Sequence, residues 1–331
     1  MTSPLWTIRG RPADPPAPDW NRGRKGKQPC FRLWGIVNIT PDSFHDGGHH
    51  FFCQNAVAHA RRLAEEGASV LDLGGASSRP GAEEIPVQEE TARVLPVLNI
   101  LVEDRKKAFS CPSFPLLSVD TWRAKVAVAA LEAGADVIND ISACSREPAL
   151  RDILAQYRPG YVLMHSRGCF GGTCARPNGH ENVLDELLDF FEQGMKELTA
   201  AGLPESNILL DPGVGFGKNN EESRVVLTGI ERLFSLGRPL LLGVSHKSLF
   251  GDLLGLGPDA RTQPTLICSA LMAARGVQHH RVHDVAEARQ ALELTALLGT
   301  MGGDKDSGRT WEQQGHARHD GRPAARSGLM G

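Results

Sequence analysis

The feature that most constrains this fold is a series of short segments, rich in valine, isoleucine and leucine, that alternate with helical patterns. Segments that are apolar almost throughout indicate strands of a parallel sheet that is buried on both faces. Eight of them in about 250 residues predict a closed (β/α)8 TIM barrel, an α/β fold, with an open doubly wound sheet as the alternative. They lie at residues 33–38, 68–75, 115–120, 135–140, 160–165, 207–213, 239–245 and 278–284.

Glycines mark the ends of most helices between these strands. Glycine is favoured just after a helix because it adopts the left-handed conformation without a steric penalty. The expected helices are 53–66, 122–133, 183–201 and 265–275, each followed by a glycine, and 285–298, which closes the series.

Both ends of the chain differ from the repeating part. Residues 1–28 are rich in Pro, Arg and Gly without periodicity, and residues 302–331 are polar. Such segments lack the apolar face that packing requires, so we expect a disordered tail at each end. The 331 residues are therefore expected to hold a single domain, a barrel over residues 29–301.

The overall charge and the cysteines argue against several classes of protein. With 36 basic and 39 acidic residues the net charge is −3, so no global field favours nucleic acid or an anionic membrane. The seven cysteines stand singly, without a C-x-x-C pair, which is poor material for a disulfide framework. No stretch approaches the roughly 20 apolar residues of a membrane span. We expect a soluble, cytoplasmic protein with reduced thiols.

Two cysteines and two histidines allow one further interpretation, a metal cluster. These are Cys169, Cys174, His165 and His180. Their spacing matches no standard zinc pattern, so we treat the cysteines as ordinary thiols.

Every predicted strand ends in polar residues. A single Asp, Asn or Ser at such a position is commonly a helix cap or a turn residue. In a TIM barrel, however, the carboxyl ends of all strands meet at one rim, where active sites form. Convergence of so many polar groups there predicts a binding site. The residues are Asn38, Asp72, Asp120, Asn139, Asp140, His165, Asp211, Ser245, His246, Lys247, Arg281, His283 and Asp284.

These residues fall into two chemical groups. Carboxylates and an amide suit a neutral heterocycle that presents several N–H donors and a carbonyl. Cationic and imidazole groups suit phosphate or carboxylate. The first group is Asp120, Asn139 and Asp211, and the second is Arg79, Lys247, Arg281 and His283.

Two loop segments flank the predicted rim. Residues 40–48 and 77–82 contain glycines with Phe44 and Arg79 near their tips, and we expect them to be mobile lids. Residues 211–218, DPGVGFGK, fit neither the Walker A nor the dinucleotide-binding spacing. This last segment is therefore not read as a nucleotide-binding loop.

Seven segments, taken in order, resemble the signatures of the dihydropteroate synthase family, one for almost every strand. The likeness covers residues 35–298, nearly all of the expected barrel. The segments are GIVNITPDSFHDGG, LDLGGASSRPGA, SVDTWRAKVAVAALEAGADVINDIS, LMHSRG, ILLDPGVGFGK, LLGVSHKSLFG and RVHDV.

The resemblance implies an enzyme of folate biosynthesis. It would join 6-hydroxymethyl-7,8-dihydropterin pyrophosphate to p-aminobenzoate and release pyrophosphate and 7,8-dihydropteroate. Mg²⁺ is the implied cofactor, the substrates are the implied partners, and a homodimer formed through outer helices is expected.

The resemblance also implies residue roles. Catalytic roles fall on Asp46, Arg79, Asp120 and Lys247, and the pterin would be held by Asp120, Asn139, Asp211 and Lys247. The pyrophosphate would be held by Asn38, Arg281 and His283, with Asn38 also touching the metal. The p-aminobenzoate slot would be formed by Phe44, Ser78, Pro80 and Ser248.

The chain departs from the family pattern at three places. His246 stands where arginine is usual, Ala76 replaces a glutamate, and residues 169–177 form a glycine- and cysteine-containing stretch. Two other functions therefore stay open. One is a non-catalytic pterin-binding paralogue, and the other is a methyltetrahydrofolate–corrinoid methyltransferase, which would not need a pyrophosphate pocket.

Overall fold

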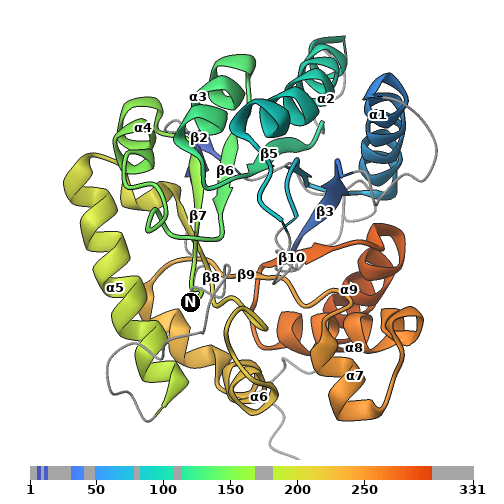
Figure 1. Cartoon of the computed structure of the whole chain (residues 1–331). Coiled ribbons are helices and arrows are strands. Elements are labelled where there is room, and N and C mark those ends of the chain that lie inside the picture. Colours follow the sequence, from blue (N-terminus) through green and yellow to red (C-terminus); the bar gives the residue numbers. More distant parts are fainter. Residues whose placement is uncertain are drawn as a thin grey trace, which may run out of the picture.

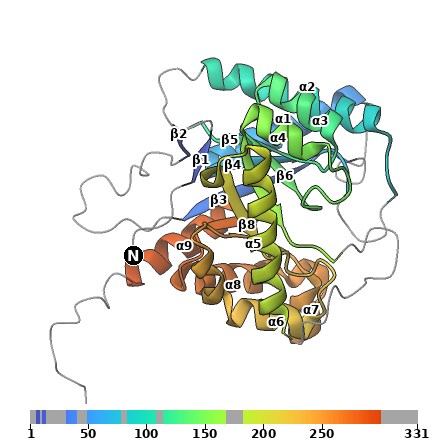
Figure 2. The same ribbon diagram turned by 90° about the vertical axis from the view of Figure 1, so that its left-hand side faces the viewer.

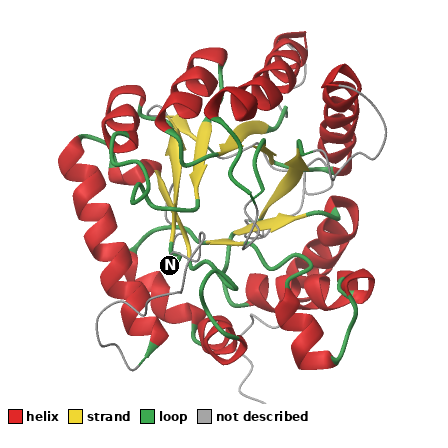
Figure 3. Cartoon of the chain, viewed as in Figure 1, coloured by secondary structure: helices red, strands yellow, loops and turns green. Residues whose placement is uncertain are grey.

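Eight parallel strands form a ring that is enclosed by helices, as predicted (Figures 1 and 3). The computed structural model describes residues 6–8, 11–13, 31–40, 49–77, 83–107, 114–167 and 182–299. The strands of the ring are β3 (Arg32–Asn38), β4 (Val70–Gly74), β5 (Leu116–Asp120), β6 (Val137–Asp140), β7 (Gly160–Met164), β8 (Ile208–Asp211), β9 (Leu241–Leu242) and β10 (His279–Val282).

The order of the strands in the sheet is β8, β7, β6, β5, β4, β3, β10, β9. A parallel bridge between Leu210 and Leu240 joins the two ends of this sheet. There the Leu210 N–H donates to the Pro239 carbonyl at 3.1 Å. The ring therefore closes, and the open doubly wound alternative is wrong.

The helices surround the ring. They are α1 (His49–Glu66), α2 (Val87–Lys107), α3 (Ala124–Ala133), α4 (Leu150–Tyr157), α5 (Val183–Ala201), α6 (Asn220–Thr228), α7 (Ser248–Leu254), α8 (Thr262–Ala274) and α9 (Val285–Gly299). Short 3-10 segments lie at η3 (Glu205–Asn207), η4 (Ile230–Leu236) and η5 (Pro258–Ala260). None of the helices within these described ranges is long and apolar enough to cross a bilayer.

Local chemistry explains where individual helices begin and end. Helix α5 has the predicted bounds because the Asn182 side chain caps its first turn and Gly202 ends it at φ 114°. Helix α8 begins at Thr262, earlier than predicted, because Pro264 lies in the first turn, where no backbone N–H is required. Helix α3 begins two residues later than predicted because Arg123 is still extended.

Part of the N-terminal segment that we expected to be a tail is ordered. Strands β1 (Thr7–Ile8) and β2 (Arg11–Pro12) form a short antiparallel hairpin (Figure 2). Trp6 is 1% exposed and stacks on Trp34 with ring centroids 5.9 Å apart. The Trp6 indole N–H donates to the Asn207 carbonyl at 2.9 Å. The hairpin therefore packs against the amino ends of the strands and helps to close that end of the barrel.

An inner layer of apolar side chains continues from this hairpin into the barrel. It is formed by Trp6, Ile8, Ala13, Trp34, Val70, Val137, Val162, Leu209 and Leu241, all of them buried. Because the amino end of the barrel is filled, the carboxyl end is left for a binding site.

We expect Trp6→Ala to lower the free energy of unfolding by about 3–5 kcal/mol, the usual cost of emptying a large buried aromatic site. Denaturant titration monitored by circular dichroism measures this difference. The control is Leu254→Ala, because Leu254 is 60% exposed at the end of α7, and its effect should stay within about 0.5 kcal/mol. Equal effects of the two substitutions would show that the hairpin does not stabilise the barrel.

Candidate active site

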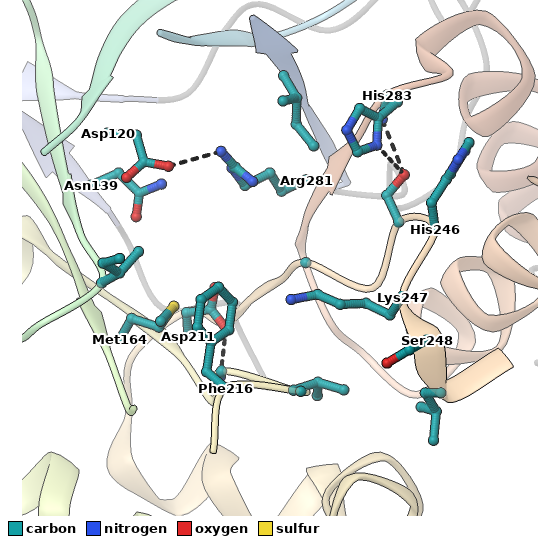
Figure 4. Close-up of a pocket in the computed structure, with 18 of the residues that line it drawn as sticks. Asp120, Asn139, Met164, Asp211, Phe216, His246, Lys247, Ser248, Arg281 and His283 are labelled. Carbon is teal, nitrogen blue, oxygen red and sulfur yellow. Dashed lines mark hydrogen bonds and ion pairs between the residues drawn. The ribbon is translucent and has the colours of Figure 1, made fainter. Parts of the chain in front are cut away.

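A cavity of about 650 Å³ opens where the strands run into the following loops. The polar side chains predicted for the rim line it together with neighbours that the sequence analysis did not single out, among them Met164, Phe216 and Lys218. Figure 4 shows side chains from both sides of the barrel pointing into this space. The predicted residues that line it are Asn38, Asp120, Asn139, Asp211, Ser245, His246, Lys247, Ser248, Arg281 and His283.

One side of the cavity is organised by a fully buried carboxylate, Asp72. Its Oδ2 accepts a hydrogen bond from Arg281 Nε at 2.7 Å and another from Asn139 Nδ2 at 2.9 Å. Arg281 also donates through Nη2 to Asp120 Oδ2 at 3.0 Å (Figure 4). Arg281 therefore lies between two acids, and Asp72 itself lies behind the cavity wall instead of lining it.

Burial controls the charge of the two carboxylates that do line the cavity. It raises the pKa of Asp120 to about 7, although the charge of Arg281 acts in the opposite direction. Burial also raises the pKa of Asp211, against the hydrogen bond that the Gly213 N–H donates to its Oδ1 at 2.7 Å. Both side chains are thus poorly hydrated acceptors.

Lys247 extends into the cavity from the loop between β9 and α7 (Figure 4). Its Nζ lies 4.0 Å from the centroid of the Phe216 ring, a cation–π distance. Burial lowers the pKa of Lys247 to about 8, and the opposing charge of Asp211 limits this shift. Lys247 and Phe216 offer a cationic and an aromatic surface beside Asp211.

His283, which follows the last strand, is held as a neutral ring. The Ser245 Oγ accepts from the His283 backbone N–H at 3.2 Å and lies 2.8 Å from His283 Nδ1. When the Ser245 hydroxyl donates to Nδ1, the ring hydrogen lies on Nε2. Burial, with the charges of His246 and Arg281, lowers the pKa of His283 to about 4. His283 can therefore donate to an anion as a neutral imidazole.

His246, which replaces the usual arginine, pairs with Asp284. Its Nε2 lies 2.8 Å from Asp284 Oδ2, which also accepts from the Thr262 hydroxyl at 3.3 Å. The His246 backbone has φ 56°, a left-handed conformation that is uncommon for a residue with a Cβ. This pairing directs one imidazole nitrogen toward α8 and α9.

A buried ionic network fixes the loop that follows β8. Lys218 is 7% exposed and donates to His165 Nδ1 at 2.7 Å, to the His165 carbonyl at 3.2 Å and to the Gly213 carbonyl at 3.1 Å. Burial lowers the pKa of Lys218 to about 7, and its ammonium form has three hydrogens, one for each of these acceptors. Since Nδ1 of His165 is an acceptor, its Nε2 hydrogen faces Glu186 Oε1 at 3.1 Å.

The network continues to the outer helices. Arg167 binds Glu186 through Nε at 2.9 Å and Nη2 at 2.6 Å, and Glu222 through Nη1 at 2.7 Å. Burial alone would raise the pKa of Glu186, but the bonds from Arg167 and His165 hold it at about 2. Glu222 in turn completes a capping box with Asn219 at the start of α6.

Gly213 is required where this network meets Asp211. It has φ 60°, and a Cβ there would lie 1.9 Å from the His165 carbonyl oxygen. Its N–H binds Asp211 and its carbonyl binds Lys218. The segment 211–218 therefore serves to orient side chains in the cavity, which agrees with our rejection of a nucleotide-binding loop.

Not every predicted strand-end residue lines the cavity. His165 belongs to the Lys218 network, and Asp284 pairs with His246. Asp140 accepts from the Ser142 and Cys144 backbone N–H groups and from the Tyr161 hydroxyl, so it anchors the turn after β6. The turn interpretation is thus the better one for Asp140, whereas His165 and Asp284 bind other side chains.

Several predicted site residues lie outside the described residues. They are Phe44, Asp46, Ser78, Arg79 and Pro80, together with most of the two expected lids and Cys169, Cys174 and His180. In the part of the chain that is described, no three His, Cys, Asp or Glu side chains gather as a metal cluster would require.

Comparison with known proteins decides the family. The sequence profile described as "Pterin binding enzyme" matches residues 34–283. The dihydropteroate synthase of Bacillus subtilis (strain 168) is 37% identical over 271 residues, which cover 82% of this chain and 90% of that protein. This chain belongs to the pterin-binding enzymes, among the dihydropteroate synthases.

Solved structures of these pterin-binding enzymes share the fold. The Xanthomonas albilineans dihydropteroate synthase with 4-aminobenzoic acid has a TM-score of 0.73 and 40% identity, covering 81% of this chain and 93% of that chain. The same enzyme in complex with 7,8-dihydropteroate has a TM-score of 0.70 and 38% identity, with coverage of 81% and 93%. The barrel of this pterin-binding enzyme and the family resemblance of its signature segments are thus confirmed.

For this pterin-binding enzyme we expect Lys218→Met to lower the free energy of unfolding by at least about 2 kcal/mol. The substitution leaves the Nδ1 and the carbonyl oxygen of His165 without the Lys218 donor, whereas the Gly213 carbonyl keeps the Phe216 N–H at 3.0 Å, and the loss of hydrogen bonds to buried groups is costly. The control is Lys106→Met, because the Lys106 side chain is 62% exposed and pairs with Glu103, which lies one turn earlier in the same helix. Urea unfolding of both variants checks the difference, and indistinguishable midpoints would contradict the role given to Lys218.

Proposed function

We propose that this chain catalyses the dihydropteroate synthase reaction: 6-hydroxymethyl-7,8-dihydropterin pyrophosphate and p-aminobenzoate give 7,8-dihydropteroate and pyrophosphate. The observation that carries the proposal is the two-sided cavity. The cavity is lined by acceptor groups of Asp120, Asn139 and Asp211 and by donor groups of Arg281, His283 and Lys247, with Arg281 in contact with Asp120. The family membership supports the same reaction.

The pterin is proposed to bind at the acid-lined side. A pterin edge presents N–H donors and a carbonyl, and the carboxylates of Asp120 and Asp211 with the amide of Asn139 match this pattern. Lys247 and Phe216 would lie against the ring, where their 4.0 Å contact supplies a stacking surface. Poor hydration of both carboxylates makes their hydrogen bonds to ring N–H groups stronger than in water.

The pyrophosphate is proposed to bind at Asn38, Arg281 and His283. The residues present fit Mg²⁺, because Asn38 supplies one amide oxygen at the cavity wall. Among the residues that the structure describes, no group of acidic side chains would compete with the substrate for the ion. This suits an ion that is held mainly by substrate phosphates and water. Bound there, Mg²⁺ would neutralise charge on the leaving group.

The reaction is proposed to begin with cleavage of the carbon–oxygen bond at the pterin methylene. The electron pair leaves with the pyrophosphate, which Arg281 and the His283 N–H stabilise. The pterin ring delocalises the resulting positive charge, and the aniline nitrogen then forms the new carbon–nitrogen bond and loses a proton to solvent. The side chains orient, neutralise charge and exclude water, and none acts as a nucleophile.

The p-aminobenzoate position is proposed at Ser248, which is exposed at the first turn of α7 and lines the cavity. Phe44, Ser78 and Pro80 are proposed to complete this slot. Asp46 and Arg79 keep their proposed catalytic roles by family resemblance.

We also propose a cellular location, an oligomeric state and a class of ligand for this chain. Cys53, Cys144 and Cys268 are free thiols in the described part of the chain, which supports a reducing cytoplasm. Helices α8 and α9 pack beside each other and expose Ile267, Leu271, Leu294 and Leu298, which supports a homodimer. The net charge of −3 supports small-molecule substrates without a nucleic acid partner.

The purified chain, given both substrates and Mg²⁺, should form pyrophosphate and 7,8-dihydropteroate in equal amounts. Chromatography of the pteroate and a coupled phosphate assay measure the two products. Replacing the pterin pyrophosphate by methyltetrahydrofolate and a corrinoid acceptor tests the methyltransferase alternative, which we expect to give no turnover. Pterin binding without any product would instead favour the non-catalytic paralogue.

Binding of the pterin should depend on pH because an ionised Asp120 carboxylate accepts N–H bonds more strongly than the protonated acid. With a pKa of about 7, this carboxylate loses its charge as the pH falls. The affinity for 6-hydroxymethylpterin at pH 6 should therefore be weaker than at pH 7.5 by up to roughly eightfold. Calorimetry measures this affinity at both pH values.

The control for this pH dependence is Asp120→Asn, which cannot titrate and should bind weakly with similar affinity at both pH values. A wild-type affinity that does not change between pH 6 and 7.5 would remove Asp120 from the pterin contact.

A further inference from the structure

The buried Asp72 carboxylate contacts one residue from each half of the proposed site. Its Oδ2 accepts from Arg281 Nε at 2.7 Å, on the pyrophosphate side, and from Asn139 Nδ2 at 2.9 Å, on the pterin side. Asp72 is 0% exposed and lies behind the cavity wall. A ligand in the cavity would therefore touch Arg281 and Asn139, and Asp72 would act on it through them.

The order of the strands explains how one carboxylate reaches both side chains. Strands β10, β4 and β6 alternate around the ring, with β3 and β5 between them. Inward-pointing side chains from alternate strands of a TIM barrel share one layer. Asp72 on β4 therefore lies between Arg281 on β10 and Asn139 on β6.

Asp72 helps to fix which part of the Arg281 guanidinium a ligand can reach. Arg281 Nε donates to Asp72, and Nη2 donates one hydrogen to Asp120 at 3.0 Å, so the two acids hold one edge of the planar group. These contacts leave the second Nη2 hydrogen and both Nη1 hydrogens for a ligand. An anion such as pyrophosphate would thus meet N–H groups whose direction is already set.

Asp72 also sets the orientation of the Asn139 amide. A carboxylate offers only acceptors, so the amide nitrogen and not the amide oxygen faces it. The amide oxygen is left to accept an N–H from a ligand in the cavity, which Asn139 lines. Without Asp72 the amide could turn and present a donor in place of this acceptor.

We propose that Asp72 is a positioning residue for both ligands, acting through Arg281 on the pyrophosphate and through Asn139 on the pterin. This inference rests on the proposed function, which supplies the two ligand classes. Because one oxygen, Oδ2, makes both contacts, loss of that acceptor should weaken the binding of both ligands.

The test replaces Asp72 by alanine and, as the matched control for charge, by asparagine. Asp72→Ala removes the acceptor, so the dissociation constants of pyrophosphate with Mg²⁺ and of 6-hydroxymethylpterin should each rise by roughly tenfold. Asp72→Asn removes the negative charge, but its amide oxygen can still accept from both donors. This variant should bind pyrophosphate at least as tightly as the wild type does, and calorimetry measures all the constants.

The two variants separate held geometry from charge by the direction of the change. If Asp72 acted through its charge alone, both substitutions would strengthen pyrophosphate binding, because each removes a negative group near the anion. Unchanged or tighter pyrophosphate binding by Asp72→Ala would therefore overturn the inference. Equal losses in the two variants would overturn it as well, because the acceptor that asparagine retains would then have no effect.

A second background tests the route to the pterin. In an Asn139→Ala protein, the further change Asp72→Ala should weaken pterin binding no more, because the side chain through which Asp72 acts is already absent. A general loss of structure would instead weaken pterin binding equally in both backgrounds, and this result would overturn the inference.

Ser118→Ala is the control for a change inside the barrel. Ser118 on β5 pairs in register with Asp72, and its buried hydroxyl has no hydrogen-bond partner among the described residues. Both ligands should bind this variant as they bind the wild type. If thermal melting shows that Asp72→Ala does not fold, Asp72→Ser takes its place, because the serine hydroxyl is too short to reach both donors.

The wild type distinguishes failure of this inference from failure of the proposed function. A wild type that binds neither ligand would overturn the proposed function together with the inference. A wild type that binds both ligands, with an Asp72→Ala variant that binds them equally well, would overturn the inference alone.

Discussion

The closed ring of parallel strands is the constraint on which the rest of this molecule depends. Because all strands run in one direction, every strand delivers its last residue to the same rim. Residues as distant in sequence as Asn38, Asp120 and Arg281 therefore line one cavity. The sequence need only place a polar residue at each strand end, and the fold gathers them.

This regularity explains how much could be predicted from the sequence. The strands, the barrel and the cavity-lining residues follow from a repeating pattern, so Asp211 and Lys247 could be named in advance. The roles of Lys218 and Asp72 could not, because each depends on a partner far along the chain: His165 lies 53 residues before Lys218, and Arg281 lies 209 residues after Asp72. The two-residue strands β1 and β2 are too short to show any periodicity.

Two buried charges at the rim show the same arrangement: each is accompanied by a donor or acceptor that another buried group holds in place. Asp211 has the Gly213 N–H, which is fixed in turn by Lys218, and Arg281 has Asp72. Such chains of contacts keep polar groups oriented before a ligand arrives, and preorganised groups lose little by reorganising during a reaction.

The aromatic closure at the amino end of the barrel has a consequence for the opposite end. Acids with raised pKa, a lysine with lowered pKa and left-handed residues such as His246 all reduce the stability of the rim. Trp6, Trp34 and the apolar layer beneath them offset this at a place where no chemistry occurs. The residues of the proposed active site and the residues that stabilise the barrel thus lie at opposite ends of the same strands. A substitution that stabilises the amino end therefore need not lower the activity.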